Sequence, residues 1–590
     1  MIVKMKKLTL IFSERHHCEA LQSLRQLGAL HIKHMRRPSA DYITSLEHKM
    51  LSADEALGII SNLSSHGERV ELEDKIPIIK EVIALGNKKK QLQINLEEAK
   101  VRRLWYQEWG DIPFAKLEYL KKAGVFLRLY RCSKKAFKQI AKEKTICILN
   151  RKAGEIFFVL FSTDKDERLD IPEVALPKEE KSHLDKKIKV YSNNLAETEA
   201  DLAELSVYKS ELLDYKKDLA KRLDFCKARF GMASDEGIRV LQGFCPREVV
   251  GDIEALAAKE GWGLTIQEPE SIQEVPTLIR NPKWVRIIKP VFDFMGTLPG
   301  YKEYDISFWF LLFFSLFFAM IIGDAGYGFV FLGATIFAHK KFRSLQKEPF
   351  FLMYVLSCAT IIWGAITGTW FGFEGATQLP LINALIISKI NTFIDSNQVF
   401  IIYLCFLIGA IQLTIAHSVV AFRYINSLVA LGQIGWIFII WVAFFLAGNL
   451  VLNKPMPGFV PALGAVGAGL VILFSHPQKN ILKGIAAALI DFPLSAISSF
   501  SDIVSYLRLF AVGYATVAVA TTFNNMAIGP GINSFLAGII AAVILFLGHS
   551  LNIVLGLMSV VVHGIRLNML EFSGHLSMQW SGNEYKPFKE

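Results

Sequence analysis

Polar and charged side chains recur inside two of the most apolar stretches of the sequence, which run at about 490–525 and 533–573. The first stretch contains SDIVSYLRLFAVG, in which Arg508 lies between apolar residues. A cation at the centre of a bilayer costs about 3 kcal/mol by insertion scales, so a chain that keeps one usually gives it a function. Fixed positive charge inside a membrane segment is typical of a pathway for ions.

The spacing of these polar residues places them on one face of each predicted helix. At about 100° per residue, the first helix carries a stripe within an arc of roughly 80°, formed by Ser498, Ser501, Ser505, Arg508 and Thr516, with Asp502 at its edge. The second helix carries a stripe within an arc of roughly 100°, formed by His549, Asn552, Ser559, His563 and Arg566, with Glu571 and His575 continuing beyond it. Two interpretations remain open: a buried structural network, or a polar path for an ion.

Charge is distributed unevenly along the 590 residues. Residues 301–590 contain only 14 of the 65 Lys and Arg residues and 11 of the 55 Asp and Glu residues. This pattern predicts a soluble domain over 1–300 and a membrane domain over 301–590. The net charge of +10 forms no basic stripe and no nucleic-acid-binding module is recognisable, so we expect no nucleic-acid partner.

The cysteines and the N-terminus give weaker signals. The seven cysteines are scattered without a CxxC pair, and the four histidines between residues 16 and 34 lack ligands at matching spacing, so we expect neither disulfides nor a metal site. The opening MIVKMKKLTLIF is followed at once by SERHHCEA and does not have the form of a secretory signal. We therefore expect the N-terminal half to be cytoplasmic.

The sequence pattern of the soluble half predicts two α/β lobes joined by an antiparallel coiled coil. Strand and helix patterns alternate at about 1–50 and 238–270 in one lobe, and at about 115–170 in a distal lobe. The two helical arms of the coiled coil are expected at about 70–110 and 180–232. In the second arm a seven-residue repeat places Leu184, Leu205, Leu212 and Leu219 on one seam. A solvated helix pair is the alternative interpretation of the arms.

The second half predicts an all-α, multi-pass membrane domain of about eight helices. Its apolar stretches run at about 306–339, 350–373, 398–422, 429–449, 457–475, 490–525 and 533–573. The first is interrupted by GDAGYG and has basic residues on both flanks, which predicts a hairpin of two short helices with both ends in the cytoplasm. The same rule places both chain termini there. The last two helices, over 490–525 and 533–573, are expected to be long and tilted. A helix over 533–573 would be about 60 Å long, so it must tilt strongly or project from a hydrocarbon core of about 30 Å.

Four blocks of this sequence together resemble a known family. They are FFAMIIGDAGYGFVF, IIWGAITGTWFG, VSYLRLFAVG and GHSLNIVLGLMSVVVHGIRLNMLEFSG, in this order after the two-lobed half. They resemble the stator subunit of V-type and A-type rotary ATPases, called subunit I in prokaryotes and subunit a in eukaryotes. The resemblance covers nearly the whole chain.

The resemblance implies a static membrane subunit beside a rotating ring whose subunits each carry an ion-binding carboxylate. Arg508 then matches the arginine that faces the ring, Arg566 matches the second arginine, and His563 and Glu571 match further family positions. Asp502, Ser505, His549 and Asp324 are half-channel candidates on wheel geometry alone, and Asp324 has the alternative role of stabilising the helix break. The sequence departs from some relatives at Thr516 and Gly556, where those have histidine and glutamate.

The resemblance also implies the partners. They are the rotor ring, peripheral-stalk subunits, the central-stalk cap of the ring and the lipid bilayer of the cell membrane. The sequence contains no GxxxxGK[ST] motif, so we expect ATP chemistry on partner subunits and no cofactor in this chain. A secondary ion-coupled transporter is the alternative function, and a structural scaffold is a third. The ion, H⁺ or Na⁺, and the direction of coupling stay open.

Overall fold

The structure is a computed structural model that divides into two compact units. It describes residues 1–589 apart from 62, 64–73, 112, 135, 138–144, 153, 165, 178, 344, 476–480, 530 and 532–533. Unit 1 comprises Met1–Thr9, Ala29–His31 and Gly243–Pro587, and unit 2 comprises Leu10–Gly28, Ile32–Gln242 and Phe588–Glu590. Every residue considered below as a functional site lies in unit 1.

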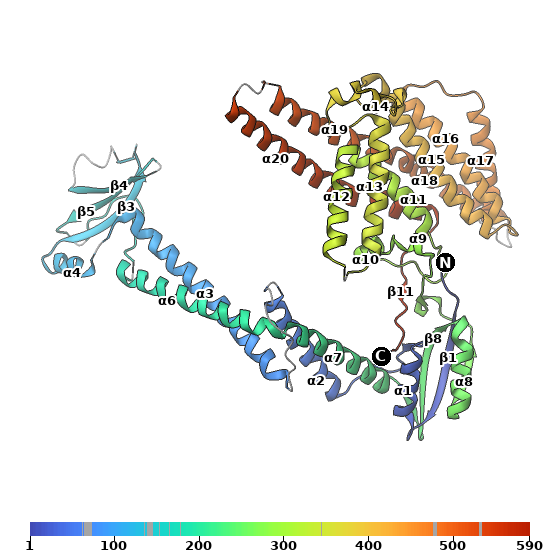
Figure 1. The fold of residues 1–590 in the computed structure, drawn as a ribbon, viewed down its shortest axis with the longest axis horizontal. Helices are drawn as coiled ribbons and strands as arrows, with labels where there is room; N and C mark the ends of the chain where they lie inside the picture. The colour runs from blue at the N-terminus through green and yellow to red at the C-terminus, as the bar shows by residue number, and fades with distance from the viewer. Residues whose placement is uncertain are drawn as a thin grey trace. The chain divides into compact units, whose positions relative to one another are not determined.

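Long helices form most of unit 2. They are α1 (His17–Leu27), α2 (Asp41–Ile60), α3 (Ile76–Trp109), α6 (Lys181–Leu205) and α7 (Lys209–Phe230). Helices α3 and α6 lie side by side (Figure 1), and the ion pairs Lys89–Glu199 and Arg103–Asp185 show that they run in opposite directions. The short helix η1 (Ser206–Tyr208) then interrupts the predicted repeat, and α7 packs along α2 instead. The sequence pattern does not indicate α2 as a partner of this arm.

A small antiparallel sheet lies beyond α3 and α6. Its strands β3 (Phe126–Ser133), β4 (Ile146–Lys152), β5 (Glu155–Ser162) and β6 (Glu173–Val174) are ordered β4-β5-β3-β6, and α4 (Phe114–Lys122) precedes them. The core of this sheet is aromatic, because Tyr130 stacks on Phe158 and Trp109 packs edge-on against Phe157. A second sheet has the order β2-β8-β1-β9, with β7 paired to β8. Its elements are β1 (Met5–Ser13), β2 (His31–Lys33), β7 (Ala233–Asp235), β8 (Ile238–Pro246) and β9 (Gly263–Gln267), with helix α8 (Val250–Glu260) between β8 and β9.

The rest of unit 1 is helical and apolar. Its longer helices are α11 (Ser307–Ile322), α12 (Ala325–Lys341), α13 (Glu348–Thr367), α15 (Gln398–Arg423), α16 (Val429–Leu452), α17 (Val460–Phe474), α18 (Ile481–Ser505), α19 (Leu507–Ile528) and α20 (Phe535–Ser559). Shorter elements are α9 (Lys283–Arg286), α10 (Lys289–Met295), α14 (Pro380–Asn383), α21 (Ser573–His575), and the paired strands β10 (Pro276–Thr277) and β11 (Asn583–Glu584).

Within the described residues, five helical stretches are long and apolar enough to cross a membrane. The number rises to six if α11 and α12, which meet at 119°, count as one broken span, and α17 is a shorter apolar helix. The predicted order, in which a half that contains strands precedes a half of apolar helices, is therefore confirmed. The number of eight spans and the domain boundary near residue 300 stay predictions.

The bend between α11 and α12 has a local cause. Gly323 ends α11 in the left-handed region, with a φ of 69° that favours glycine. The Asp324 carboxylate then caps α12 by accepting hydrogen bonds from the backbone N–H groups of Gly326 (2.7 Å) and Tyr327 (3.2 Å). Helix α13 passes very close to this cap at Gly364, where no side chain fits.

Helix α11 forms the centre of the helical region. Its residues Phe310, Phe314 and Phe317 are buried in a hydrophobic core. The same core contains Tyr506 and Leu509 from the junction of α18 and α19, and Leu567 and Phe572 from the segment after α20. This packing fixes the two segments that carry the predicted polar stripes. Close packing of these phenylalanine rings makes this a rigid support.

We expect Gly364→Ala to destabilise the bend. The added Cβ would lie 2.0 Å from the backbone nitrogen of Ala325 and 2.7 Å from its Cα, and backbone atoms cannot move aside as a side chain can. The expected loss is about 2 kcal/mol, the usual size of an overpacking effect. The matched control is Gly333→Ala on α12, where an added Cβ meets no atom within 4 Å. Thermal unfolding of the full-length chain in detergent measures both, and an equal midpoint for the two variants would contradict the close approach.

Candidate functional site

Arg508 lies directly after a helix break. Helix α18 ends at Ser505 and α19 begins at Leu507, so the carbonyl of Ser505 lies at the end of a helix, where backbone carbonyls often accept from side chains. The Nε of Arg508 donates to this carbonyl at 3.0 Å. Tyr506, at the break, is fully buried and its hydroxyl donates to Oε1 of Gln412 on α15 at 2.8 Å. The break is thus held by one arginine and one tyrosine.

The chain after α20 continues in two π-helical segments, η7 (Val560–Gly564) and η8 (Leu567–Phe572). A π-helical turn contains more residues than an α-helical turn, so each segment rotates the following side chains relative to an ideal wheel. Such segments are frequently found at functional sites. Glu571 lies within η8, and this rotation decides which groups it meets.

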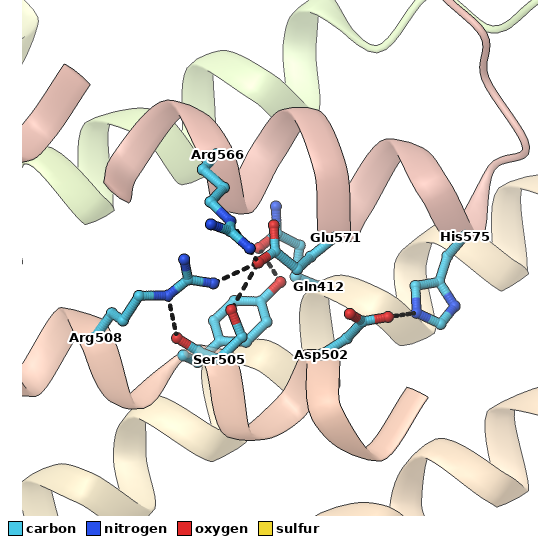
Figure 2. A network of polar contacts seen from close by, with 8 residues as sticks. Gln412, Asp502, Ser505, Arg508, Arg566, Glu571 and His575 are labelled. Atoms are coloured by element: carbon cyan, nitrogen blue, oxygen red, sulfur yellow. Dashed lines mark hydrogen bonds and ion pairs between the residues drawn. The ribbon is translucent and has the colours of Figure 1, made fainter. Parts of the chain in front are cut away.

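Glu571 is the centre of a charged cluster with Arg508, Ser505 and Arg566 (Figure 2). Its Oε1 accepts from Nη2 of Arg508 at 2.5 Å and from the hydroxyl of Ser505 at 2.6 Å, and it lies 3.8 Å from Nε of Arg566. The Glu571 side chain is 5% exposed, whereas Arg508 is 25% and Arg566 54% exposed. Two cations and one carboxylate leave the cluster with a net positive charge.

The second oxygen of Glu571 stands apart from this arrangement. Among the described residues, the buried Oε2 has no hydrogen-bond partner, and the same holds for Nδ1 of His563. A buried carboxylate oxygen of this kind is costly unless a further donor reaches it.

A chain of hydrogen bonds lies beside the charged cluster. The carboxylate of Asp502 is 3.1 Å from Nε2 of His575, as Figure 2 shows, and Nδ1 of His575 is 2.8 Å from Nε2 of His417. His417, on α15, also contacts Oε1 of Gln433 on α16 at 2.6 Å through Nδ1. Each imidazole has two ring nitrogens that can act as donor or acceptor, so these contacts link α15, α16 and the end of the chain through polar side chains.

A second polar cluster contains His549 and Asp324. His549 is 2.8 Å from the hydroxyl of Tyr327 and 3.1 Å from Oδ1 of Asn524, and Asn552 donates to Tyr327 at 2.9 Å. Asp324 is bound differently, because its two oxygens accept from four backbone N–H groups, those of Gly326, Tyr327, Phe371 and Gly372, at 2.7–3.2 Å. Its contacts are those of a helix cap.

The structure brings together four of the predicted residues, namely Arg508, Arg566, Ser505 and Glu571, and places Asp502 beside them. His549 and Asp324 lie in the second cluster, whereas His563 interacts electrostatically with Arg508 and Arg566 and its Nδ1 makes no hydrogen bond within the described part of the chain. Gln412 and His417 were missed, as were Gln433, Tyr327 and Asn524. The available signal was the isolated polar residue in an otherwise apolar span, as at Gln412 and His417 in QLTIAH.

The fold and the buried charges define a membrane protein with a mixed N-terminal region and an ionised cluster among its apolar helices. No family model matches the chain. The chain is 32% identical to V-type ATP synthase subunit I of Borreliella burgdorferi over the whole of both chains. It is 28% identical to V-type ATP synthase subunit I 1 of Treponema pallidum, again over both full lengths, and 28% identical to A-type ATP synthase subunit I of Methanocaldococcus jannaschii over 55% of this chain and 50% of that protein.

The chain belongs to the subunit I family of V-type and A-type ATP synthases, as the sequence blocks predict. One crystal structure, of the cytoplasmic N-terminal domain of subunit I, a homologue of V-ATPase subunit a, covers 44% of this chain at 12% identity with a TM-score of 0.22. Membership makes the chain a membrane subunit of a rotary ATPase complex that associates with other subunits of that complex. Membership of this family argues against the alternative that the chain is a secondary ion-coupled transporter.

We expect Arg508 and Glu571 to be energetically coupled. Glu571→Gln leaves Arg508 without its carboxylate, and Arg508→Gln leaves a buried carboxylate without its cation, so each single variant is destabilised. The double variant should lose less than the sum of the two, by about 1 kcal/mol or more. Thermal unfolding of the full-length chain in detergent measures the four forms.

The exposed pair Arg102–Glu98, with a separation of 3.3 Å and both side chains more than half exposed, is the control for this cycle. Its coupling should be about 0.5 kcal/mol or less. Additive losses at Arg508 and Glu571 would show that the contact contributes nothing.

Proposed function

We propose that this chain is the static ion-translocation subunit of its rotary ATPase, with Arg508 and Arg566 facing the carboxylates of a rotor ring. The observation that carries the proposal is the net positive cluster of two arginines around Glu571, placed among apolar helices. The exposed side chain of Arg566 and the partly exposed Arg508 give this charge access to a neighbouring surface.

Arg508 has the hydrogen-bonding capacity for a ring carboxylate. Its described bonds use Nε and Nη2, which leaves Nη1 for a further acceptor. A guanidinium is always charged and binds carboxylates in a planar, two-pronged geometry. A ring carboxylate that arrives beside Arg508 would be favoured in its ionised form, because an opposite charge stabilises it. It must therefore release its ion before it passes.

Glu571 has a matching role in this proposal. When a ring carboxylate engages Arg508, the carboxylate of Glu571 keeps Ser505 and Arg566 as partners, so the buried charge is never left alone. When the ring carboxylate leaves Nη1, Glu571 still accepts from Nη2 of Arg508. The arginine then stays in place without a large penalty between two passages.

The two remaining polar groups provide the half-channels on opposite sides of Arg508. Asp502 precedes Arg508 along α18 and begins the chain through His575 and His417. Thr516 follows Arg508 along α19, and its carbonyl accepts from Asn552 in the cluster of His549. The positive charge between them blocks direct passage of a cation, so ions cross only on the ring. The four backbone N–H bonds to Asp324 support a positioning role for this residue.

The distribution of charge supports the proposed orientation, and membership of the subunit I family supports the proposed partners. Basic residues before α11 and between α12 and α13 place these ends of the helices, and both termini, in the cytoplasm of a cell-membrane protein. The long helices α3, α6 and α7 then act as part of the stator and bind peripheral-stalk subunits and the central-stalk cap. Hydrolysis or synthesis of ATP takes place on partner subunits, and the carboxylate site of the ring selects H⁺ or Na⁺.

The test compares Arg508→Gln with the unmodified chain in the whole complex, reconstituted into vesicles. We expect the variant complex to assemble and hydrolyse ATP, while ATP-driven ion uptake falls to background, because no charge then displaces the ion from the ring. ATP hydrolysis and uptake are recorded on the same vesicles.

The matched control is Arg423→Gln, which removes an arginine of the same domain that packs over the ring of Tyr304 at 4.7 Å. It should leave uptake unchanged. Uptake near the normal rate in an intact Arg508→Gln complex would show that the arginine is structural and would overturn the proposal.

A further inference from the structure

A groove of about 930 Å³ opens at one end of the membrane helices, away from the charged cluster. It lies between α9 and the first turns of α11 and α13. Its wall is apolar and aromatic, formed by Trp284, Ile287, Phe308, Leu312, Phe351 and Val355. Trp284 is 59% exposed, Leu312 50% and Phe351 48%, so the protein itself does not cover this wall.

The mouth of this groove is cationic. Lys283 and Lys347 line it, and both are exposed. In the part of the chain that the structure describes, neither lysine has a carboxylate partner. Arg286 pairs with Glu348 at 2.8 Å and so joins α9 to α13 across the groove. A smaller basic pocket with Lys340 and Arg343 adjoins it, and the two share Lys347 and Tyr354.

Apolar wall and cationic mouth together match one kind of molecule. Trp284 contacts the ring of Phe308 edge-on at 5.6 Å, beside Lys283, in the arrangement that tryptophan and lysine adopt where a membrane meets water. A free anion would use the lysines and leave the wall exposed to water, and a neutral lipid would leave the lysines unpaired. An anionic phospholipid uses both parts, with its phosphate at the lysines and an acyl chain along the wall.

We propose that this groove is a binding site for a single anionic phospholipid, held between α9, α11 and α13. The lipid would contact Lys283 and Trp284 of α9 and Phe351 and Val355 of α13. It would therefore join these two helices. The inference needs only that the chain is a membrane subunit, so it stands or falls independently of the role of Arg508.

The test titrates the full-length chain in detergent with dioleoylphosphatidylglycerol or dioleoylphosphatidylcholine and counts bound lipid by native mass spectrometry. We expect one phosphatidylglycerol to bind more tightly than phosphatidylcholine. Each cation near a phosphate raises the binding affinity about fivefold, so Lys283→Gln with Lys347→Gln should weaken the binding of phosphatidylglycerol by about 25-fold. Leu312→Trp, which fills the groove without changing its charge, should also remove the lipid.

Lys121→Gln with Lys122→Gln is the control, since these exposed lysines on the distal lobe change the net charge equally. It should bind lipid normally, and thermal midpoints show that all variants are folded. Equal binding of the two lipids, or unchanged binding by the Lys283 and Lys347 variant, would overturn the proposal. Displacement of phosphatidylglycerol by millimolar inorganic phosphate would also overturn it, because the site would then be one for free anions.

Discussion

A single buried carboxylate, that of Glu571, determines how two arginines are kept inside an apolar helical region. Oε1 of Glu571 accepts from Arg508 and Ser505 and lies near Arg566, which makes these charges tolerable. An isolated buried charge would cost several kcal/mol. Because two cations share one anion, the cluster remains positive, and this excess charge is what the proposed transport function uses.

The surrounding fold is arranged to hold this contact. The break between α18 and α19 places Arg508 at the start of a helix, the π-helical segments turn Glu571 toward it, and α11 packs against both. Asp324 shows the contrasting case of a buried carboxylate. Four backbone N–H groups satisfy it, so it stabilises a bend and has no oxygen left for exchange. Burial alone therefore does not distinguish the proposed transport residue Glu571 from the helix cap Asp324.

Sequence was sufficient to find the charged residues, and insufficient to pair them. Arg508 and Glu571 are conspicuous because each interrupts an apolar stretch, but a wheel of constant pitch cannot be extended through two π-helical segments. His417 was missed because its contact with His575 depends on the packing of α15 against the end of the chain. The pairing of α2 with α7 was missed for the same reason, since helix partners are set by tertiary contacts.

The most direct test of the central claim is the passive ion leak through the reconstituted complex, measured without ATP under an imposed ion gradient. If Arg508 is the positive barrier between two half-channels, the unmodified complex is tight and the Arg508→Gln complex leaks, while Arg423→Gln stays tight. A tight Arg508→Gln complex that still takes up ions with ATP would contradict the account.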